Sequence, residues 1–365
     1  MIPVTKPYLP SREKLDKYID GIYERHWLTN NGQLVQELTR RLEEYLGVEN
    51  LLLVANGTLA LQIAYRALGV SDHQPEQRPE AITTPFTFIA TASSLKWDGV
   101  EPVFVDIDPH TWCMDPANIE VAITPNTRAI VPVHVFGHAC DVEAIDYIAN
   151  KHKLKLIYDA SHAFGVTYKG ESLLKHGDAA TLSFHATKLF HTGEGGAIVF
   201  KRKDDLERAR KMINFGITGP ESIEALGINA KMSELQAAMG LCVLDEMEAN
   251  LKARSAVWSR YEETLSKAIQ LQTKHQALGY NYAYFPVVFN SEEQVVRVAA
   301  ALKESGVLTR RYFYPSLESI GCLGTIGELP TSTNIASRIL CLPISSGISA
   351  ETIEKILSIV IAVIN

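Results

Sequence analysis

Residues 178–200 read DAATLSFHATKLFHTGEGGAIVF, and this stretch decides the fold. Its apolar and β-branched residues predict one short buried strand before Lys188 and a second at residues 197–200, after a glycine-rich turn. Lys188 therefore lies just past a strand end inside an α/β core. A lysine placed there is poorly hydrated, so its neutral amine can bind an aldehyde covalently. A lysine in a surface turn is the alternative, and that description fits most lysines.

The chain around this stretch alternates between short apolar strands and helical patterns. Besides the strand before Lys188, at 180–184, strands are predicted at residues 51–55, 81–84, 102–106, 130–135 and 154–159. This alternation predicts an α/β fold in which helices cover both faces of a mostly parallel sheet.

The pattern changes near residue 244. One long helix at 233–265 leads to a strand pair around 284–289, a helix at 292–305 and a closing helix at 351–364. We therefore expect a large α/β domain over residues 1–244, including the N-terminal segment, and a smaller α+β domain over residues 245–365.

Composition excludes several classes of protein. A formal net charge of -7 argues against a nucleic-acid partner. The N-terminus has no apolar signal core, and the apolar run at 359–364 is too short to span a membrane. Five cysteines without CxxC spacing indicate reduced thiols, so we expect a cytoplasmic protein.

Several strand ends carry polar or aromatic residues, and ligands of α/β sheets bind at these ends. Gly57 and Thr58 open a helix after the first strand and, with Ser183, are expected to hold a phosphate. Asp159 follows an apolar strand and needs a cationic partner, while Phe88 can lie against a planar ring. Helix caps at Thr58 and Asp159 and a core position for Phe88 are the alternatives.

Taken together, these groups suit one ligand. It has a phosphate, a planar ring with a basic nitrogen, and an aldehyde that Lys188 binds. Pyridoxal phosphate has all of these features, and an aspartate keeps its ring nitrogen protonated so that the ring accepts electrons. We expect this cofactor and no metal. A zinc site at His134, His138 and Cys140 is disfavoured because Gly137 interrupts the helix that would align the histidines.

A set of motifs in chain order resembles a known family, the DegT/DnrJ/EryC1/StrS sugar aminotransferases. They are GTLAL at 57–61, TPFTF at 84–88, PVHVFG at 132–137, DASH at 159–162, SFHATK at 183–188, GG at 195–196, GINAK at 227–231 and LQAA at 235–238. The resemblance implies a fold-type-I aminotransferase and a homodimer with active sites at the subunit interface. It also implies that Asn229 reaches the partner's cofactor phosphate and that His162 contacts the cofactor's phenolic oxygen. Lys231 departs from the family's usual arginine.

The N-terminal motifs VTKP at 4–7 and LTNNG at 28–32 are similar to members that aminate C4 of dTDP-4-keto-6-deoxyglucose. The resemblance implies L-glutamate as donor and dTDP-4-amino-4,6-dideoxyglucose as product, a sugar for O-antigen or other surface polysaccharide. Substrate contacts are expected from Thr29, Gly32, His134, Arg310 and Tyr314.

Other functions remain open at this point. Amination at C3 and a UDP-sugar substrate fit the same motifs. A sugar dehydratase on this fold has histidine at the position of Lys188. A cofactor-binding regulatory protein without activity is the alternative outside the enzymes. Residues 312–314 suit either a base-stacking role or a strand with one packed face.

Overall fold

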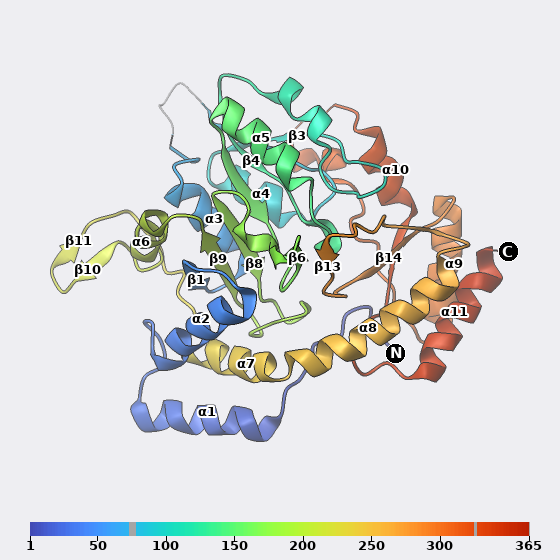
Figure 1. Cartoon of the computed structure of the whole chain (residues 1–365), viewed down its shortest axis with the longest axis horizontal. Helices are drawn as coiled ribbons and strands as arrows, with labels where there is room; N and C mark the ends of the chain where they lie inside the picture. The colour runs from blue at the N-terminus through green and yellow to red at the C-terminus, as the bar shows by residue number, and fades with distance from the viewer. Residues whose placement is uncertain (73–77, 325–326, 365) are drawn as a thin grey trace.

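The computed structural model describes residues 1–72, 78–324 and 327–364. A seven-stranded sheet forms the centre of the molecule (Figure 1). Its strand order is β1-β9-β8-β5-β4-β2-β3. The strands are β1 (Leu51–Val54), β2 (Glu80–Thr83), β3 (Glu101–Phe104), β4 (Thr127–Val131), β5 (Lys155–Asp159), β8 (Ala179–Ser183) and β9 (Gly196–Phe200). Only β9 runs antiparallel to its neighbours in this sheet, so the predicted mostly parallel sheet is confirmed.

Helices cover both faces of this sheet because successive side chains of each strand point to opposite sides. In β1, Leu51 and Leu53 pack into one apolar cluster, whereas Leu52 and Val54 pack into the other. On the first side lie α2 (Gln33–Leu46), α5 (Val142–His152) and α7 (Glu234–Asp245). On the second side lie α3 (Gly57–Ala67), α4 (Ala90–Trp97) and α6 (Lys203–Met212). The core is therefore double, one apolar layer on each face.

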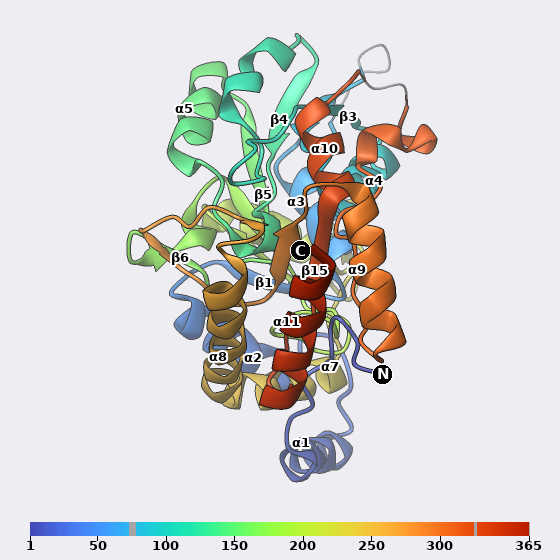
Figure 2. The ribbon, with the colours of Figure 1, turned by 90° about the vertical axis from the view of Figure 1, so that its right-hand side faces the viewer.

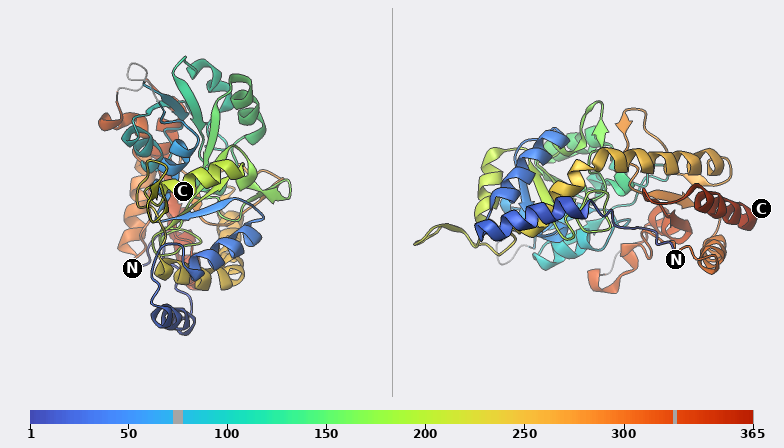
Figure 3. Two further views of the ribbon diagram at one scale, coloured as in Figure 1. Left: turned by 90° about the vertical axis from the view of Figure 1, so that its left-hand side faces the viewer. Right: turned by 90° about the horizontal axis from the view of Figure 1, so that it is seen from below.

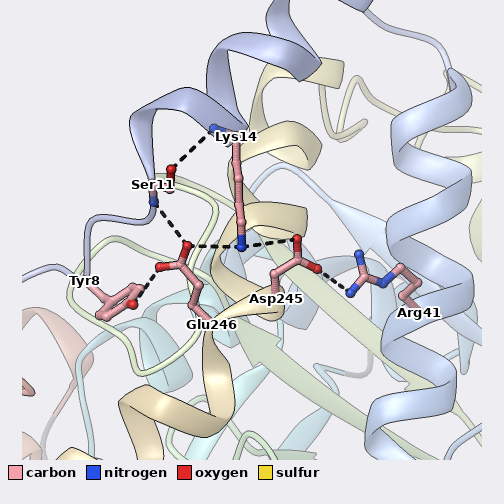
Figure 4. A network of polar contacts seen from close by, with 6 residues as sticks. All are labelled: Tyr8, Ser11, Lys14, Arg41, Asp245 and Glu246. Carbon is pink, nitrogen blue, oxygen red and sulfur yellow. Dashed lines mark hydrogen bonds and ion pairs between the residues drawn. The ribbon is translucent and has the colours of Figure 1, made fainter.

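The single helix predicted at 233–265 is wrong, because it breaks at Glu246 into α7 and α8 (Met247–Leu265). The carboxylate of Glu246 accepts hydrogen bonds from the Tyr8 hydroxyl at 2.7 Å and from the Ser11 amide at 3.3 Å (Figure 4). Lys14 of α1 (Arg12–Arg25) lies 3.4 Å from the same carboxylate. These contacts fix the N-terminal segment to the helix break.

A second, three-stranded sheet belongs to the C-terminal part (Figure 2). It has the order β12-β14-β15, formed by β12 (Gln270–Leu271), β14 (Phe285–Val288) and β15 (Ile339–Leu342). Residues of α8, α9 (Glu292–Glu304) and α11 (Ala350–Ile364) form an apolar cluster with it, and α10 (Pro330–Arg338) leads into β15. Residues 312–314 form no strand. The domain division near residue 244 stays a prediction.

The remaining short strands lie at the margins. A three-stranded sheet joins β13 (Leu278–Gly279), β6 (Thr167–Tyr168) and β7 (Glu171–Ser172). The hairpin of β10 (Ile217–Gly219) and β11 (Ser222–Ile223) extends away from the body of the molecule (Figure 3). No described helix is both long and apolar enough to cross a membrane.

Candidate active site

A cavity of about 660 Å³ opens at the carboxyl ends of β1, β5 and β8. Eight of the residues predicted for the site line it, namely Gly57, Thr58, Phe88, Asp159, His162, Ser183, Lys188 and Arg310. Three aromatic residues that the sequence did not single out for this site individually, Tyr284, Tyr312 and Phe313, complete the wall. The cavity therefore combines side chains near the strand ends of the large sheet with side chains from loops of the C-terminal part of the chain.

One end of the cavity is the N-terminus of α3. Asn56 caps this helix by accepting the amide hydrogen of Leu59 at 2.9 Å. The amides of Gly57 and Thr58 have no partner within the helix because they lie in its first turn. A Cβ atom on Gly57 would lie 2.8 Å from that of Ser183, so only glycine permits this approach of helix and strand. The result is a cluster of donors beside the Ser183 hydroxyl, which suits a phosphate.

Asp159 ends β5 with its carboxylate buried at 5% exposure. It accepts hydrogen bonds from the Thr91 hydroxyl at 2.8 Å and the Ser161 amide at 3.1 Å. No cation among the described residues lies within ion-pair distance of it. The helix-cap alternative is wrong, since residues 160–166 contain no helix. A buried carboxylate that lines a cavity without a cation suits a protonated ring nitrogen.

Lys188 lines the cavity rather than the outer surface. Its amine lies 3.4 Å from the phenolic oxygen of Tyr284. Burial lowers the pKa of Lys188 to about 8, with a further lowering from the charge of Arg310 and an opposing effect from Asp159. The amine is therefore partly neutral near neutral pH and able to act as nucleophile or base.

His162 is buried beside Lys188 and stays neutral. Burial, and then the nearby Lys188, holds the pKa of His162 well below its usual range. Its Nδ1 accepts the amide hydrogen of Phe136 at 3.1 Å, so the ring hydrogen lies on Nε2. The ring lies nearly parallel to the rings of Phe136 and Phe313, at centroid distances of 5.9 and 5.8 Å. This fixes one N–H donor at the site.

Some predicted residues lie outside the cavity. His134, predicted as a substrate contact, is fully buried, stacks on Tyr158 at 4.5 Å and accepts the Cys140 amide hydrogen at 3.2 Å. The prediction for His134 is therefore wrong, because the chain after β4 turns this side chain into the core. Tyr314 is exposed and its ring lies 3.4 Å from the guanidinium of Arg311.

The other residues outside the cavity come from two loops. Gly32 packs against the carboxyl group of Glu234, whose carbon lies 2.5 Å from the place that a Cβ atom on Gly32 would take. The backbone carbonyl of Thr29 accepts the indole hydrogen of Trp27. Asn229 is exposed and forms a β-bridge with Asn214. Substrate contacts from Thr29 and Gly32, and a contact of Asn229 with a partner's cofactor phosphate, stay predictions.

The zinc alternative gains no support from the imidazole geometry. Both ring nitrogens of His138 lie 2.8 Å from carbonyl oxygens, those of Ala139 and Thr273. The described residues contain no group of three or more His, Cys, Asp or Glu side chains suited to a metal.

The geometry defines the site of a pyridoxal-phosphate enzyme. The first turn of α3 and Ser183 suit the phosphate, Asp159 the ring nitrogen, Lys188 the aldehyde and His162 the phenolic oxygen. Phe88 is half-exposed where it lines the cavity and suits contact with the ring.

Comparison with known proteins identifies the class more closely. The profile of the DegT/DnrJ/EryC1/StrS aminotransferase family matches residues 11–361. A dTDP-4-amino-4,6-dideoxy-D-glucose transaminase of Shigella dysenteriae is 43% identical over 362 residues, covering 97% of each chain. A protein of the same name from Escherichia coli is 37% identical and covers 97% of this chain and 96% of its own.

A solved structure agrees with these relatives. The structure of DesI in the presence of its TDP-sugar product has a TM-score of 0.91 and 33% identity, and covers 100% of this chain and 93% of DesI. The chain belongs to the DegT/DnrJ/EryC1/StrS aminotransferase family. It is a fold-type-I sugar aminotransferase whose cofactor is pyridoxal phosphate.

Proposed function

We propose that the protein transfers an amino group from L-glutamate to C4 of dTDP-4-keto-6-deoxy-D-glucose, giving dTDP-4-amino-4,6-dideoxy-D-glucose. The observation that carries the chemistry is the partly neutral amine of Lys188 in one cavity with the unpaired carboxylate of Asp159. The choice of substrate is supported by the two relatives of that name, at 43% and 37% identity.

Lys188 performs the proton transfers in this proposal. When bound, the cofactor supplies a protonated ring that withdraws electrons from the carbon attached to the donor nitrogen. The amine of Lys188 takes the proton from that carbon and, in the second half-reaction, delivers a proton to the sugar carbon that is aminated. Asp159 would keep the ring nitrogen charged, and the Nε2 hydrogen that the Phe136 contact leaves on His162 would be available to the phenolic oxygen.

We further propose that two copies of the chain form a homodimer with shared active sites. The segment around β10 and β11 exposes five large apolar side chains, Phe215, Ile217, Ile223, Leu226 and Ile228. Exposed apolar patches of this kind mark protein interfaces, and Asn229 follows them directly in the chain.

The five unpaired cysteines support a cytoplasmic location. We propose that the product enters O-antigen or another surface polysaccharide, and that residues 1–244 and 245–365 form the two domains.

A product analysis tests the function. The purified protein is incubated with L-glutamate and a panel of dTDP- and UDP-linked 3- and 4-ketosugars, and the products are analysed by NMR. We expect nitrogen at C4 of the dTDP-6-deoxy sugar. Nitrogen at C3, or turnover of UDP-sugars alone, would refute the substrate while leaving the aminotransferase class intact. The visible absorbance of the bound cofactor should decrease on addition of glutamate, whereas a binding protein without activity keeps it.

A further inference from the structure

The segment 280–284, which we call the strap, joins β13 to β14 and belongs to no helix or strand itself. Its last three backbone carbonyls accept hydrogen bonds from side chains of one helix, α8. Arg254 donates to the carbonyl of Tyr282 at 3.2 Å and to that of Ala283 at 2.7 Å. Trp258, one turn further along α8, donates its indole hydrogen to the third carbonyl at 3.2 Å. Side chains of α8 therefore supply the bonds that a neighbouring strand supplies elsewhere.

The strap is also fixed at its beginning. The side-chain amide of Asn281 donates to the carbonyls of His162 and Phe164, at 2.9 and 3.0 Å. Tyr282 has a φ of 53°, in the left-handed region, and a residue other than glycine keeps such a conformation only where its surroundings hold it. The strap is thus held between α8 and the segment that follows β5, and it carries Tyr284 to the cavity wall.

Arg254 is a buried cation, with an exposed fraction of 7%. Burial lowers the pKa of Arg254 to about 10, so the guanidinium is charged at neutral pH. Burying a charge costs free energy, and packing alone would favour an apolar residue such as Val257 or Leu265 on the same buried face of α8. No carboxylate in the described ranges forms an ion pair with Arg254. The strap carbonyls are therefore the partners that account for this charge.

We propose that Arg254 is a positioning residue for the proton transfers of Lys188, because it holds the strap where the Tyr284 hydroxyl meets the lysine amine. The inference rests on the proposed function and adds to it a residue that does not line the cavity. The amine of Lys188 donates to the Tyr284 oxygen at 3.4 Å, which is already long for a hydrogen bond. A small outward shift of the strap would therefore break this contact.

The position of Tyr284 bears on the rate because a lysine side chain has many rotamers. Proton transfer requires the amine within hydrogen-bonding reach of the reacting carbon, in the correct direction. The Tyr284 oxygen restricts where the amine of Lys188 points. Arg254 touches neither the amine nor the cavity, so its loss should lower the maximal rate and leave the binding of the donor unchanged.

The first test measures how glutamate bleaches the visible absorbance of the cofactor-loaded protein. In Arg254→Met the maximal bleaching rate should fall about fivefold, as for the loss of one hydrogen bond of Lys188. The half-saturating glutamate concentration should equal that of the wild type. Arg254→Lys should show a smaller decrease, because it keeps the charge and loses the paired donors. Arg260→Gln is the matched control and should match the wild type, since Arg260 lies on the same helix and pairs at the surface with Glu354 at 2.6 Å.

A double variant separates positioning from a general loss of stability. If Arg254 acts through Tyr284, then Arg254→Met should lower the rate no further once Tyr284→Phe has removed the hydroxyl. The double variant should therefore be about fivefold slower than the wild type, like each single variant, whereas independent effects would multiply to about 25-fold. Urea unfolding of the same proteins records any change of stability separately.

A second measurement uses the apoprotein and needs no turnover. With ¹³C-labelled tyrosine, the NMR signal of the Tyr284 ring is assigned by its absence in Tyr284→Phe. This signal should shift in Arg254→Met and keep its position in Arg260→Gln. Circular dichroism confirms that each variant is folded, and Arg254→Lys carries both measurements if Arg254→Met does not fold.

The outcomes separate this inference from the function on which it rests. If no amino acid bleaches the wild type, the proposed function fails, while the NMR comparison still tests the link from Arg254 to Tyr284. If the wild type is bleached and Arg254→Met reaches the same maximal rate, the positioning role is overturned, whatever the change in stability. Rate defects that multiply in the double variant, or a change confined to the half-saturating glutamate concentration, overturn it as well.

Discussion

The amine of Lys188 donates a hydrogen bond at 3.4 Å to the phenolic oxygen of Tyr284, a residue 96 positions away in the chain. Tyr284 immediately precedes β14, and its backbone carbonyl accepts the indole hydrogen of Trp258 at 3.2 Å. Asn281, three residues before it, donates to the carbonyl of His162 at 2.9 Å. The C-terminal part of the chain therefore places one side chain directly on the lysine that follows β8.

Replacing Tyr284 by Phe should slow the glutamate half-reaction while leaving the cofactor bound. The ring packing stays, but Lys188 loses the acceptor that orients its amine, a contact worth about 1 kcal/mol, or roughly fivefold in rate. Stopped-flow measurement of the bleaching rate checks this expectation. Tyr282→Phe is the matched control, since the Tyr282 ring packs on Trp258 at 5.8 Å and does not line the cavity. Equal rates in both variants would show that Tyr284 is only a packing residue.

Lys188→Met should abolish turnover and covalent attachment of the cofactor, yet stabilise the apoprotein. Folding lowers the pKa of Lys188 from 10.5 to about 8, because burial disfavours the charged amine. At a pH below 8 the amine is charged in the folded and in the unfolded chain, so its burial destabilises the folded protein. The destabilisation is therefore complete below pH 8 and disappears as the pH rises from 8 toward 10.5. Melting temperatures of the apoproteins should differ by about 3 °C or more at neutral pH, and the difference should shrink at alkaline pH. The exposed variant Lys252→Met should show no such trend.

Asp159→Asn should lose most activity and still fold. The amide can keep both local contacts, accepting from the Ser161 amide and donating to the Thr91 hydroxyl. It lacks the charge that holds the ring nitrogen protonated, so we expect turnover to fall about 100-fold or more. Steady-state rates with circular dichroism as the folding control provide the measurement. A rate near that of the wild type would contradict the assignment of Asp159.

The parts of the site that the sequence predicted share one property. Gly57, Asp159, Ser183 and Lys188 each lie at or just past the end of an apolar strand, and the carboxyl ends of parallel strands converge. Local pattern and sheet geometry were therefore sufficient to bring them together. His134 also follows a strand, but the direction of its side chain depends on the turn after β4, which periodicity does not encode.

The C-terminal wall of the cavity was less predictable. Tyr312 and Phe313 line it, whereas the expected Tyr314 does not, because the run 312–314 forms no strand and its side chains do not alternate regularly. The break at Glu246 was missed for a similar reason. The apolar pattern continues through it, and the bonds that stabilise the break come from Tyr8 and Ser11 at the other end of the chain.

Glu246→Gln should lower the stability of the protein by about 1 kcal/mol. Burial alone would raise the pKa of Glu246, but the bonds from Tyr8, Ser11 and Lys14 outweigh it and lower the pKa. The stabilisation is therefore present above the ordinary glutamate pKa and is lost as the pH falls through the lowered value. Urea unfolding should give a difference between Glu246→Gln and the wild type at neutral pH that disappears in acid. Tyr8→Phe should remove part of the same energy, and the double variant should be less destabilised than the sum.

Two inactive variants, Lys188→Ala and Asn229→Asp, should restore activity when their subunits are mixed. Asn229 is exposed beside the apolar side chains around β10 and β11, and a carboxylate there would repel a partner's cofactor phosphate. In the hybrid dimer one site has native Lys188 and native Asn229, whereas each parent homodimer has no complete site. Random pairing makes half of the dimers hybrid with one of two sites intact, so about one quarter of wild-type activity is expected. Subunit exchange is confirmed with differently tagged chains, and Asn229→Asp alone must be inactive. Mixed dimers that form but stay inactive would place Asn229 in its own subunit's site or outside any site, because only a contribution across the interface allows one subunit to complete the site of the other.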